Sequence, residues 1–465
     1  MKKQFAVLFG IGILNLVLFF GVFTLLQSDK IYQHTLGKIS QNYERTGSWG
    51  NYEIKKVTKP YTALNNENLL RWDAVIYECL SNNMYTEGET CYGNVRAAFF
   101  PLFPVFWRLS GASPIGISLV NYLVFIASMA FLFIHLFRGK PRDRLPTFAV
   151  LITLPSAIIY YIPYTEAFFL LTMTIAAIGI IKEKYGVYVI GALLMATVRP
   201  ATAFVLLAIL AVELALLIRN KQMGLFFKRA TIKAVPFLIG YLIVILIQYI
   251  YSGSWTAYLD AQKFWAGSIQ GIKGISDWSV EGFGMNVFAI FFVAIPALLF
   301  AIYSLATFKS KEGVFSKMTS DRPALYLLMI SVFYLAGIFV FTLITSGGNL
   351  HSFFRFTLAS PFFYIAVLIC LNELPRISSK LFAGVFVVFG AFLFLFLHFT
   401  AYGGEVMQFS FLGLFLSALA FLYLGIRKSL SKLPDGAACI LIAAANIVWN
   451  TYLFNHFLSD GWIFT

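Results

Sequence analysis

Charged residues are scarce in this chain. Only 12% of its 465 residues are Asp, Glu, Lys or Arg, whereas 59% are hydrophobic, and the mean hydropathy is +0.79. A soluble globular domain has about twice that charged fraction, so the composition excludes one. The formal charge of +14 does not indicate nucleic-acid binding, because most of the 35 lysines and arginines fall in short segments between apolar runs. That distribution is typical of the cytoplasmic loops of a polytopic membrane protein.

The sequence also lacks features of several other classes. No small-residue cleavage site follows the apolar run that ends at Leu26, so we interpret residues 1–26 as a retained transmembrane helix. No internal repeat is recognisable, which disfavours a transporter built from two related halves. No His, Asp or Glu group has metal-ligand spacing, so we expect no metal and no other cofactor.

Cysteine is rare, with four residues in the chain. Cys370 and Cys439 lie in apolar runs and are interpreted as packing residues. Cys79 and Cys91 both lie in the first long polar segment, where an oxidising compartment would allow them to pair. Their spacing alone leaves a disulfide and two separate thiols open as alternatives.

Apolar runs of spanning length recur along the chain. A membrane-crossing helix needs about 20 mostly apolar residues, and we count about 13 such runs. They cover residues 5–26, 115–137, 145–163, 166–181, 186–198, 201–218, 234–251, 286–307, 324–345, 357–371, 381–400, 408–426 and 436–457. The sequence therefore predicts an all-α polytopic membrane protein.

The positions of the cations predict its topology and its parts. The basic segments alternate with nearly uncharged loops, which places residues 27–98 outside and a basic linker at 219–233 inside. Two prolines three residues apart predict a re-entrant or kinked segment at 99–108. The predicted parts are a first helix, a large extracytoplasmic loop, a transmembrane core and C-terminal helices, at 1–26, 27–98, 99–371 and 372–465.

Asp73 stands out in the first loop. At about 100° per residue, one face of a predicted amphipathic helix contains Leu69, Trp72, Ile76, Cys79 and Leu80, and Asp73 lies at the edge of that face. Such a helix lies on the membrane surface, where a half-dry carboxylate faces an arriving lipid-borne substrate. An ordinary surface carboxylate is the alternative.

Other ionisable residues gather at the same predicted outer end. They are Arg96, Glu166, Arg199, His351 and Arg355. Ionisable groups near membrane depth often mark substrate pathways, and the four-residue spacing of His351 and Arg355 predicts two donors on one helical face for a phosphate. The alternatives are a helix-dipole acid for Glu166 and headgroup anchors for the arginines. Glu213, deep in an apolar run, is interpreted as a packing or pairing residue.

Several short motifs now resemble one family. Arg71-Trp72-Asp73, followed by Ala98-Phe99-Phe100-Pro101-Leu102-Phe103-Pro104, resembles the RWD and AFFPLYP signature of the PIG-V-like (GPI mannosyltransferase II-like) family. This family belongs to the GT-C superfamily of polytopic glycosyltransferases. Further blocks similar to the family are Tyr164-Thr165-Glu166, Ala196-Thr197-Val198-Arg199 and His351 to Arg355-Phe356.

The resemblance implies an activity. It implies transfer of a sugar, with inversion, from a polyprenyl- or dolichyl-phosphate donor to a lipid, glycan or protein hydroxyl on the outer face, in a bacterial plasma membrane by our expectation. Asp73 matches the catalytic Asp of the family, and Arg199 and Arg355 match positions suited to the donor phosphate. The further candidate substrate-binding residues are Arg71, Trp72, Arg96, Tyr164, Glu166 and His351.

Three other functions remain open at this stage. A lipid-linked sugar transporter or flippase would also be polytopic, but it would more often carry polar groups at the midplane of both halves. A glycan polymerase or ligase would share the arginines at the outer end. A non-catalytic assembly factor would share the whole fold.

Overall fold

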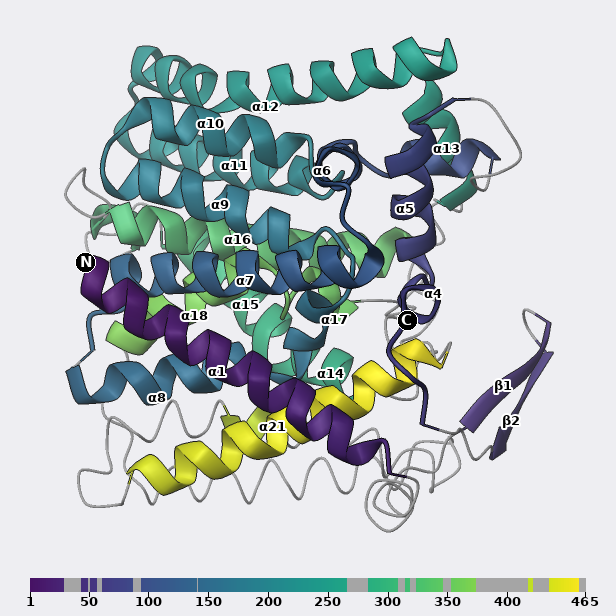
Figure 1. Ribbon diagram of the computed structural model, residues 1–465. Helices are drawn as coiled ribbons and strands as arrows, with labels where there is room; N and C mark the ends of the chain where they lie inside the picture. The colour runs from purple at the N-terminus through teal and green to yellow at the C-terminus, as the bar shows by residue number, and fades with distance from the viewer. Residues whose placement is uncertain are drawn as a thin grey trace.

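The structure is a computed structural model in which long helices lie side by side (Figure 1). It describes residues 1–28, 43–48, 51–56, 61–86, 93–139, 141–265, 283–307, 314–317, 323–345, 353–373, 417–420 and 435–459. The chain begins at the left of Figure 1, and shorter elements gather at the right-hand ends of the long helices.

Among the residues that the structure describes, seven helical runs are long and apolar enough to cross a membrane. They are α1 (Lys2–Leu26), α7 (Pro114–Leu136), α11 (Thr202–Asn220), α12 (Met223–Ser252), the continuous run of α14 (Phe283–Phe288), the π-helix η4 (Ala289–Ala294) and α15 (Ile295–Ala306), then α16 (Pro323–Thr345) and α21 (Asp435–Leu458). The chain is therefore a polytopic membrane protein, as its composition predicts.

Shorter helices occupy several of the other predicted spans. They are α8 (Pro141–Ile152) with the 3₁₀-helix η3 (Pro155–Tyr161), α9 (Glu166–Ile181), α10 (Tyr185–Ala196) and α18 (Pro361–Glu373). The α8–η3 pair would make an eighth span if counted as one. The predicted run 381–400, and all of 408–426 except residues 417–420, lie outside the described residues. The figure of about 13 spans stays a prediction.

The predicted span 145–163 is wrong as a single straight helix. The chain bends by 68° between α8 and η3. Leu154 precedes Pro155, and the proline ring disfavours helical backbone at the residue before it. Leu154 accordingly has an extended ψ of 148°.

The predicted basic linker at 219–233 is largely helical. Helix α12 begins at Met223 and includes Lys228, Arg229 and Lys233. Lysine and arginine are good helix formers, so basic character marks the membrane side of a segment without marking it as a loop.

Glu213 of α11 is a pairing residue, as the sequence analysis proposed. Its carboxylate forms an ion pair with Lys233 of α12 and accepts a hydrogen bond of 2.9 Å from the hydroxyl of Tyr326 in α16. Glu213 therefore links α11 to α12 through the ion pair and to α16 through the hydrogen bond.

The first long loop and the segment that follows it contribute short elements at one end of the molecule. They are the strands β1 (Tyr43–Ser48) and β2 (Asn51–Lys56), then α4 (Asn66–Leu69), α5 (Asp73–Asn83), η2 (Gly93–Ala98) and α6 (Leu102–Ser110). Later segments add α13 (Ala257–Trp265) and α17 (Phe353–Phe356) at this end, whereas η5 (Val314–Lys317) lies in the connection between the end of α15 and the start of α16. The all-α prediction misses the β1–β2 hairpin, whose strands pair antiparallel.

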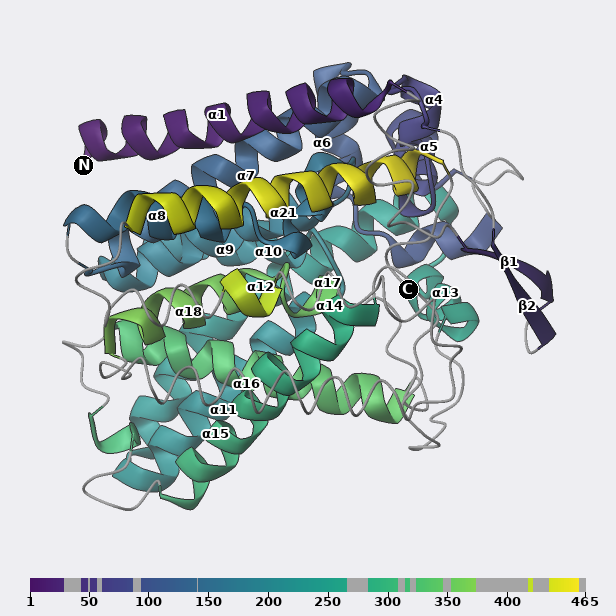
Figure 2. The same ribbon diagram turned by 90° about the horizontal axis from the view of Figure 1, so that it is seen from below.

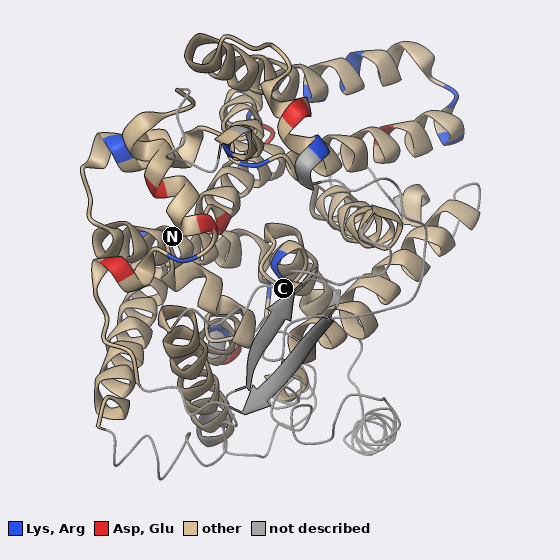
Figure 3. Ribbon diagram, turned by 90° about the vertical axis from the view of Figure 1, so that its right-hand side faces the viewer, with Lys and Arg blue, Asp and Glu red and all other residues tan. Residues whose placement is uncertain are grey.

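Helix α5 lies across the ends of the long helices at the right of Figure 1, and Figure 2 places it at the same end. Figure 3 looks onto this end, where most of the ribbon is uncharged. The predicted helix around Asp73 is present, but its boundary was wrong, and its place on a membrane surface stays a prediction. The helix begins at Asp73, so Leu69 and Trp72 precede it and do not share its face.

The segment 99–108 leads into the short helix α6, which its prolines do not break, and a re-entrant path for the segment stays a prediction. Pro101 is the residue before the first turn of α6, and Pro104 lies within that turn. The first four backbone N–H groups of a helix have no intrahelical partner, so proline costs little there. The two prolines start a short helix, and the backbone N–H of Leu102 bonds the carbonyl of Thr197 at 3.1 Å.

Candidate functional site

Four predicted site residues meet in one chain of ion pairs. Arg355 Nη1 lies 2.6 Å from Asp73 Oδ2, and Arg355 Nε donates to Glu166 Oε1. Arg199 Nη1 donates to the same Glu166 oxygen at 2.8 Å. The order is therefore Asp73, Arg355, Glu166, Arg199, a charged series at the end of the bundle that α5 crosses.

Each member comes from a different element. Asp73 is the first residue of α5, and Glu166 is the first residue of α9. Arg199 lies between α10 and α11, and Arg355 lies in α17. The N-terminus of a helix favours an acidic side chain through its dipole. Glu166 is thus both an acid at a helix N-terminus and a partner in two ion pairs, and the two roles are compatible.

Burial falls from Glu166 through Arg355 to Asp73. The side chain of Glu166 is 1% exposed, those of Arg199 and Arg355 are 9% exposed, and that of Asp73 is 23% exposed. Headgroup anchoring does not describe these two arginines, because both guanidinium groups bond the buried carboxylate of Glu166. Asp73 is the member of the series that solvent or a substrate reaches most easily.

Aromatic rings hold the two guanidinium groups in place. The guanidinium carbon of Arg355 lies 4.6 Å from the centre of the Tyr164 ring. That of Arg199 lies 5.2 Å from the ring of Phe356. Such cation–π contacts strengthen where water is excluded. Tyr164, a predicted substrate-binding residue, therefore contacts the cation that pairs with Asp73.

Tyr77 belongs to the same surroundings. It lies one helical turn after Asp73, and its hydroxyl is 3.2 Å from Thr165 Oγ1. Burial, and secondly the charge of Asp73, raise the pKa of Tyr77 well above its ordinary value. Tyr77 is thus a neutral hydroxyl beside the carboxylate. The four-residue spacing from Asp73 was the sequence signal for it.

The backbone directly before Asp73 is strained. Trp72 has φ 53° and ψ −125°, a backbone conformation that residues other than glycine rarely adopt. Residues in such conformations cost about 1–3 kcal/mol and cluster at binding and catalytic sites. The Trp72 side chain packs against the main hydrophobic core, which holds this conformation and fixes the start of α5.

The remaining predicted residues lie in several places. Arg71 Nη2 donates to Asn68 Oδ1 at 3.2 Å. Arg96 is buried in η2, an element that packs against α13. His351 lies outside the described residues, and α17 begins only at Phe353. A shared helical face for His351 and Arg355 stays a prediction.

Cys79 lies in the middle of α5 and is disulfide-bonded. Its predicted partner Cys91 lies outside the described residues, so the identity of the pair stays a prediction. Within the described part of the chain, no three His, Cys, Asp or Glu side chains form a group able to hold a metal ion.

The charges of the series cancel, since two carboxylates face two guanidinium groups. The sequence predicts that Asp73 faces an arriving substrate, whereas in the structure its carboxylate is paired with Arg355. A phosphate that binds Arg355 Nη1 exchanges with the Asp73 carboxylate that this nitrogen bonds in the structure. Arg355 is where this exchange is easiest, because its partner Asp73 is the more exposed acid.

Comparison of the chain with family models, with curated proteins and with solved structures finds no match. The resemblance to the PIG-V-like family therefore rests on the motifs around Asp73, Glu166, Arg199 and Arg355 and stays a prediction.

Proposed function

We propose that this protein is a membrane glycosyltransferase, and more narrowly a mannosyltransferase of the GT-C type. It takes a sugar from a polyprenyl- or dolichyl-phosphate donor and transfers it, with inversion, to a lipid, glycan or protein hydroxyl. The observation that carries the proposal is the ion-pair series, in which the partly exposed Asp73 is paired with the buried guanidinium group of Arg355. The proposed site faces the extracytoplasmic side of a bacterial plasma membrane.

Asp73 acts as the general base. Its carboxylate takes the proton of the acceptor hydroxyl while the hydroxyl oxygen attacks the anomeric carbon. The bond from that carbon to the phosphate oxygen breaks, and the lipid phosphate leaves with the electron pair. Attack from the face opposite the phosphate inverts the anomeric centre.

Arg355 holds the phosphate. Its Nη1 is bonded to Asp73 in the present structure, while its Nε is bonded to Glu166. A donor phosphate that takes over Nη1 leaves the Nε bond intact, so the guanidinium keeps its orientation. The same exchange releases Asp73 from its ion pair. Donor binding therefore frees the base for the acceptor.

Glu166 is a positioning residue in this scheme. It is buried and bonds both arginines through one oxygen. A fixed anion behind two guanidinium groups sets their place before a substrate arrives, which is the preorganisation that electrostatic catalysis requires.

Two variants separate these roles. Asp73→Asn keeps the size of the side chain but cannot take a proton, so turnover falls about 10²–10⁴-fold. Donor affinity stays at least as high as in the wild type, because the carboxylate no longer competes for Arg355. Arg355→Ala weakens donor binding instead, since it removes a charge-assisted contact to phosphate.

The assay uses purified protein in lipid nanodiscs, a short-chain polyprenyl-phosphate mannose as donor and alkyl mannosides as acceptors. Asp260→Asn is the control, because Asp260 is an exposed acid paired with Lys263 on α13. Its turnover should equal that of the wild type. Wild-type turnover in Asp73→Asn would exclude Asp73 as the base.

A further inference from the structure

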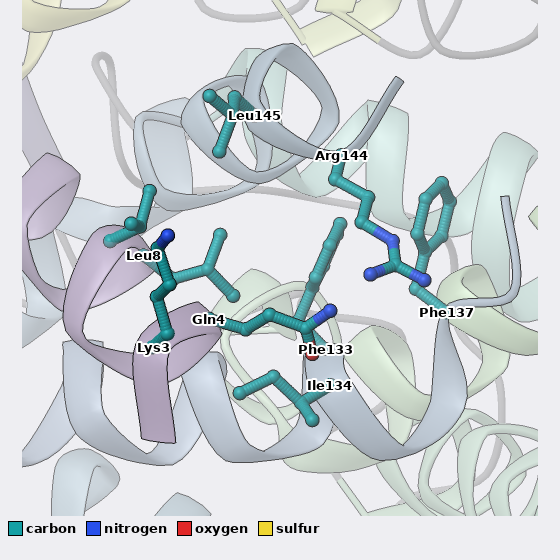
Figure 4. A pocket seen from close by; sticks show the side chains of 9 residues that line it. Lys3, Gln4, Leu8, Phe133, Ile134, Phe137, Arg144 and Leu145 are labelled. Atoms are coloured by element: carbon teal, nitrogen blue, oxygen red, sulfur yellow. The ribbon is translucent and has the colours of Figure 1, made fainter. Parts of the chain in front are cut away.

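A pocket lies at the end of the bundle opposite the candidate site. It measures about 250 Å³ and lies between the start of α1, the end of α7 and α8 (Figure 4). Its lining residues are Lys3, Gln4, Val7, Leu8, Phe133, Ile134, Phe137, Arg144 and Leu145. The proposed transferase reaction uses none of them.

The lining combines apolar walls with positive charge. Among the described residues, Lys3 and Arg144 are the two cations of the lining, and none of the lining residues is acidic. In Figure 4 the Gln4 side chain extends from α1 toward the guanidinium group of Arg144. The Nε of Arg144 is buried, and in the described part of the chain it has no hydrogen-bond partner. A buried donor without a partner costs free energy, which a ligand that accepts a hydrogen bond would recover.

The apolar part of the pocket continues onto the outer surface of the helices. Val7 is 44% exposed and Leu145 is 45% exposed, so apolar side chains run from the pocket to the surface that meets lipid tails. A ligand that suits this arrangement carries an anion at one end and a hydrocarbon chain next to it.

We propose that this pocket binds one anionic phospholipid from the leaflet opposite the candidate site. The phosphate accepts hydrogen bonds from Arg144 and Lys3, and the first part of an acyl chain lies along Val7, Leu8 and Leu145. Basic pockets between transmembrane helices bind such headgroups. A zwitterionic lipid matches less well because it brings its own cation, and inorganic phosphate matches less well because it leaves the apolar walls uncovered.

Native mass spectrometry of the full chain, with phosphatidylglycerol and phosphatidylcholine as probes, tests the proposal. Wild-type protein should bind one phosphatidylglycerol at least about tenfold more tightly than phosphatidylcholine. The double variant Lys3→Gln/Arg144→Gln should lose about tenfold or more in phosphatidylglycerol affinity, because two charge-assisted contacts are removed. The matched control is Lys2→Gln/Arg138→Gln, which removes the same charge from exposed residues near the pocket and should keep wild-type affinity.

A second variant guards against misfolding of the first. Val7→Trp keeps both cations and fills the apolar part of the pocket, so it should also lose the tightly bound lipid. Equal affinity for the two lipids, full phosphatidylglycerol affinity in both pocket variants, or competition by millimolar inorganic phosphate alone would each overturn the proposal. None of these outcomes bears on the role of Asp73.

Discussion

Glu166 is the residue on which the candidate site depends most. One of its oxygens accepts from both arginines, and the other is buried with no hydrogen-bond partner in the described part of the chain. A carboxylate this deep is stable only because two guanidinium groups neutralise it. The arginines depend on Glu166 in the same way.

Glu166→Ala should therefore destabilise the protein strongly. Breaking a buried ion pair leaves charge without compensation and typically costs about 3–5 kcal/mol. The midpoint of unfolding in a denaturing-detergent titration measures this. Asp260→Ala is the control, because it removes an acid from the exposed pair with Lys263 and should leave the midpoint unchanged. Equal midpoints for both variants would contradict the structural role of Glu166.

The sequence placed these residues at one end of the molecule but could not pair them. The alternation of basic and neutral loops brings Asp73, Glu166, Arg199 and Arg355 to the same predicted membrane face. Asp73 and Arg355 are 282 residues apart, and Glu166 and Arg355 are 189 apart. Which acid meets which arginine depends on how α5, α9 and α17 pack, and no local pattern encodes that.

At the scale of helices, α9 and α10 lie in close contact. A Cβ atom added to Gly191 would lie 2.4 Å from the backbone nitrogen of Ala176, and one added to Gly179 would lie 2.4 Å from that of Tyr188. Backbone atoms cannot rotate away as the end of a side chain can. The two glycines therefore allow the contact between these helices, one of which begins with Glu166.

Gly191→Ala should push α9 and α10 apart. Overpacking typically costs about 1–3 kcal/mol, and we expect the upper part of this range because the contact is with backbone. The same detergent titration measures the loss of stability as a lower unfolding midpoint. Gly186→Ala on the same helix is the matched control, since a Cβ there meets nothing within 4 Å. It should be neutral or slightly stabilising, because glycine is a poor helix former. A Gly191→Ala midpoint equal to that of the control would show that the helices separate without cost.

Helix positions were predictable where hydrophobicity alone decides them. The runs predicted at 115–137 and 166–181 became α7 and α9 with nearly the same ends. The errors occurred where another factor acts. Pro155 bends the span that begins with α8, prolines start α6 where a kink was predicted, and basic residues continue α12 where a loop was predicted.

The whole molecule has two chemically different ends. The end crossed by α5 carries the ion-pair series, α13 and the β1–β2 hairpin, whereas the opposite end carries the start of α1 and the pocket with Lys3 and Arg144. The proposed transferase requires the first end to face out of the cytoplasm. The positions of the basic segments in the sequence predict this orientation.

Cysteine labelling in intact cells tests that orientation. Lys263→Cys on α13 should react with a membrane-impermeant maleimide, because its side chain is 78% exposed at the α5 end. Asn220→Cys, at the exposed end of α11 among basic residues, should react only after permeabilisation. Labelling of the parent chain is subtracted, since Cys370 is exposed. The reverse pattern would place Asp73 in the cytoplasm, where a base serving an outer-face transfer has no substrate.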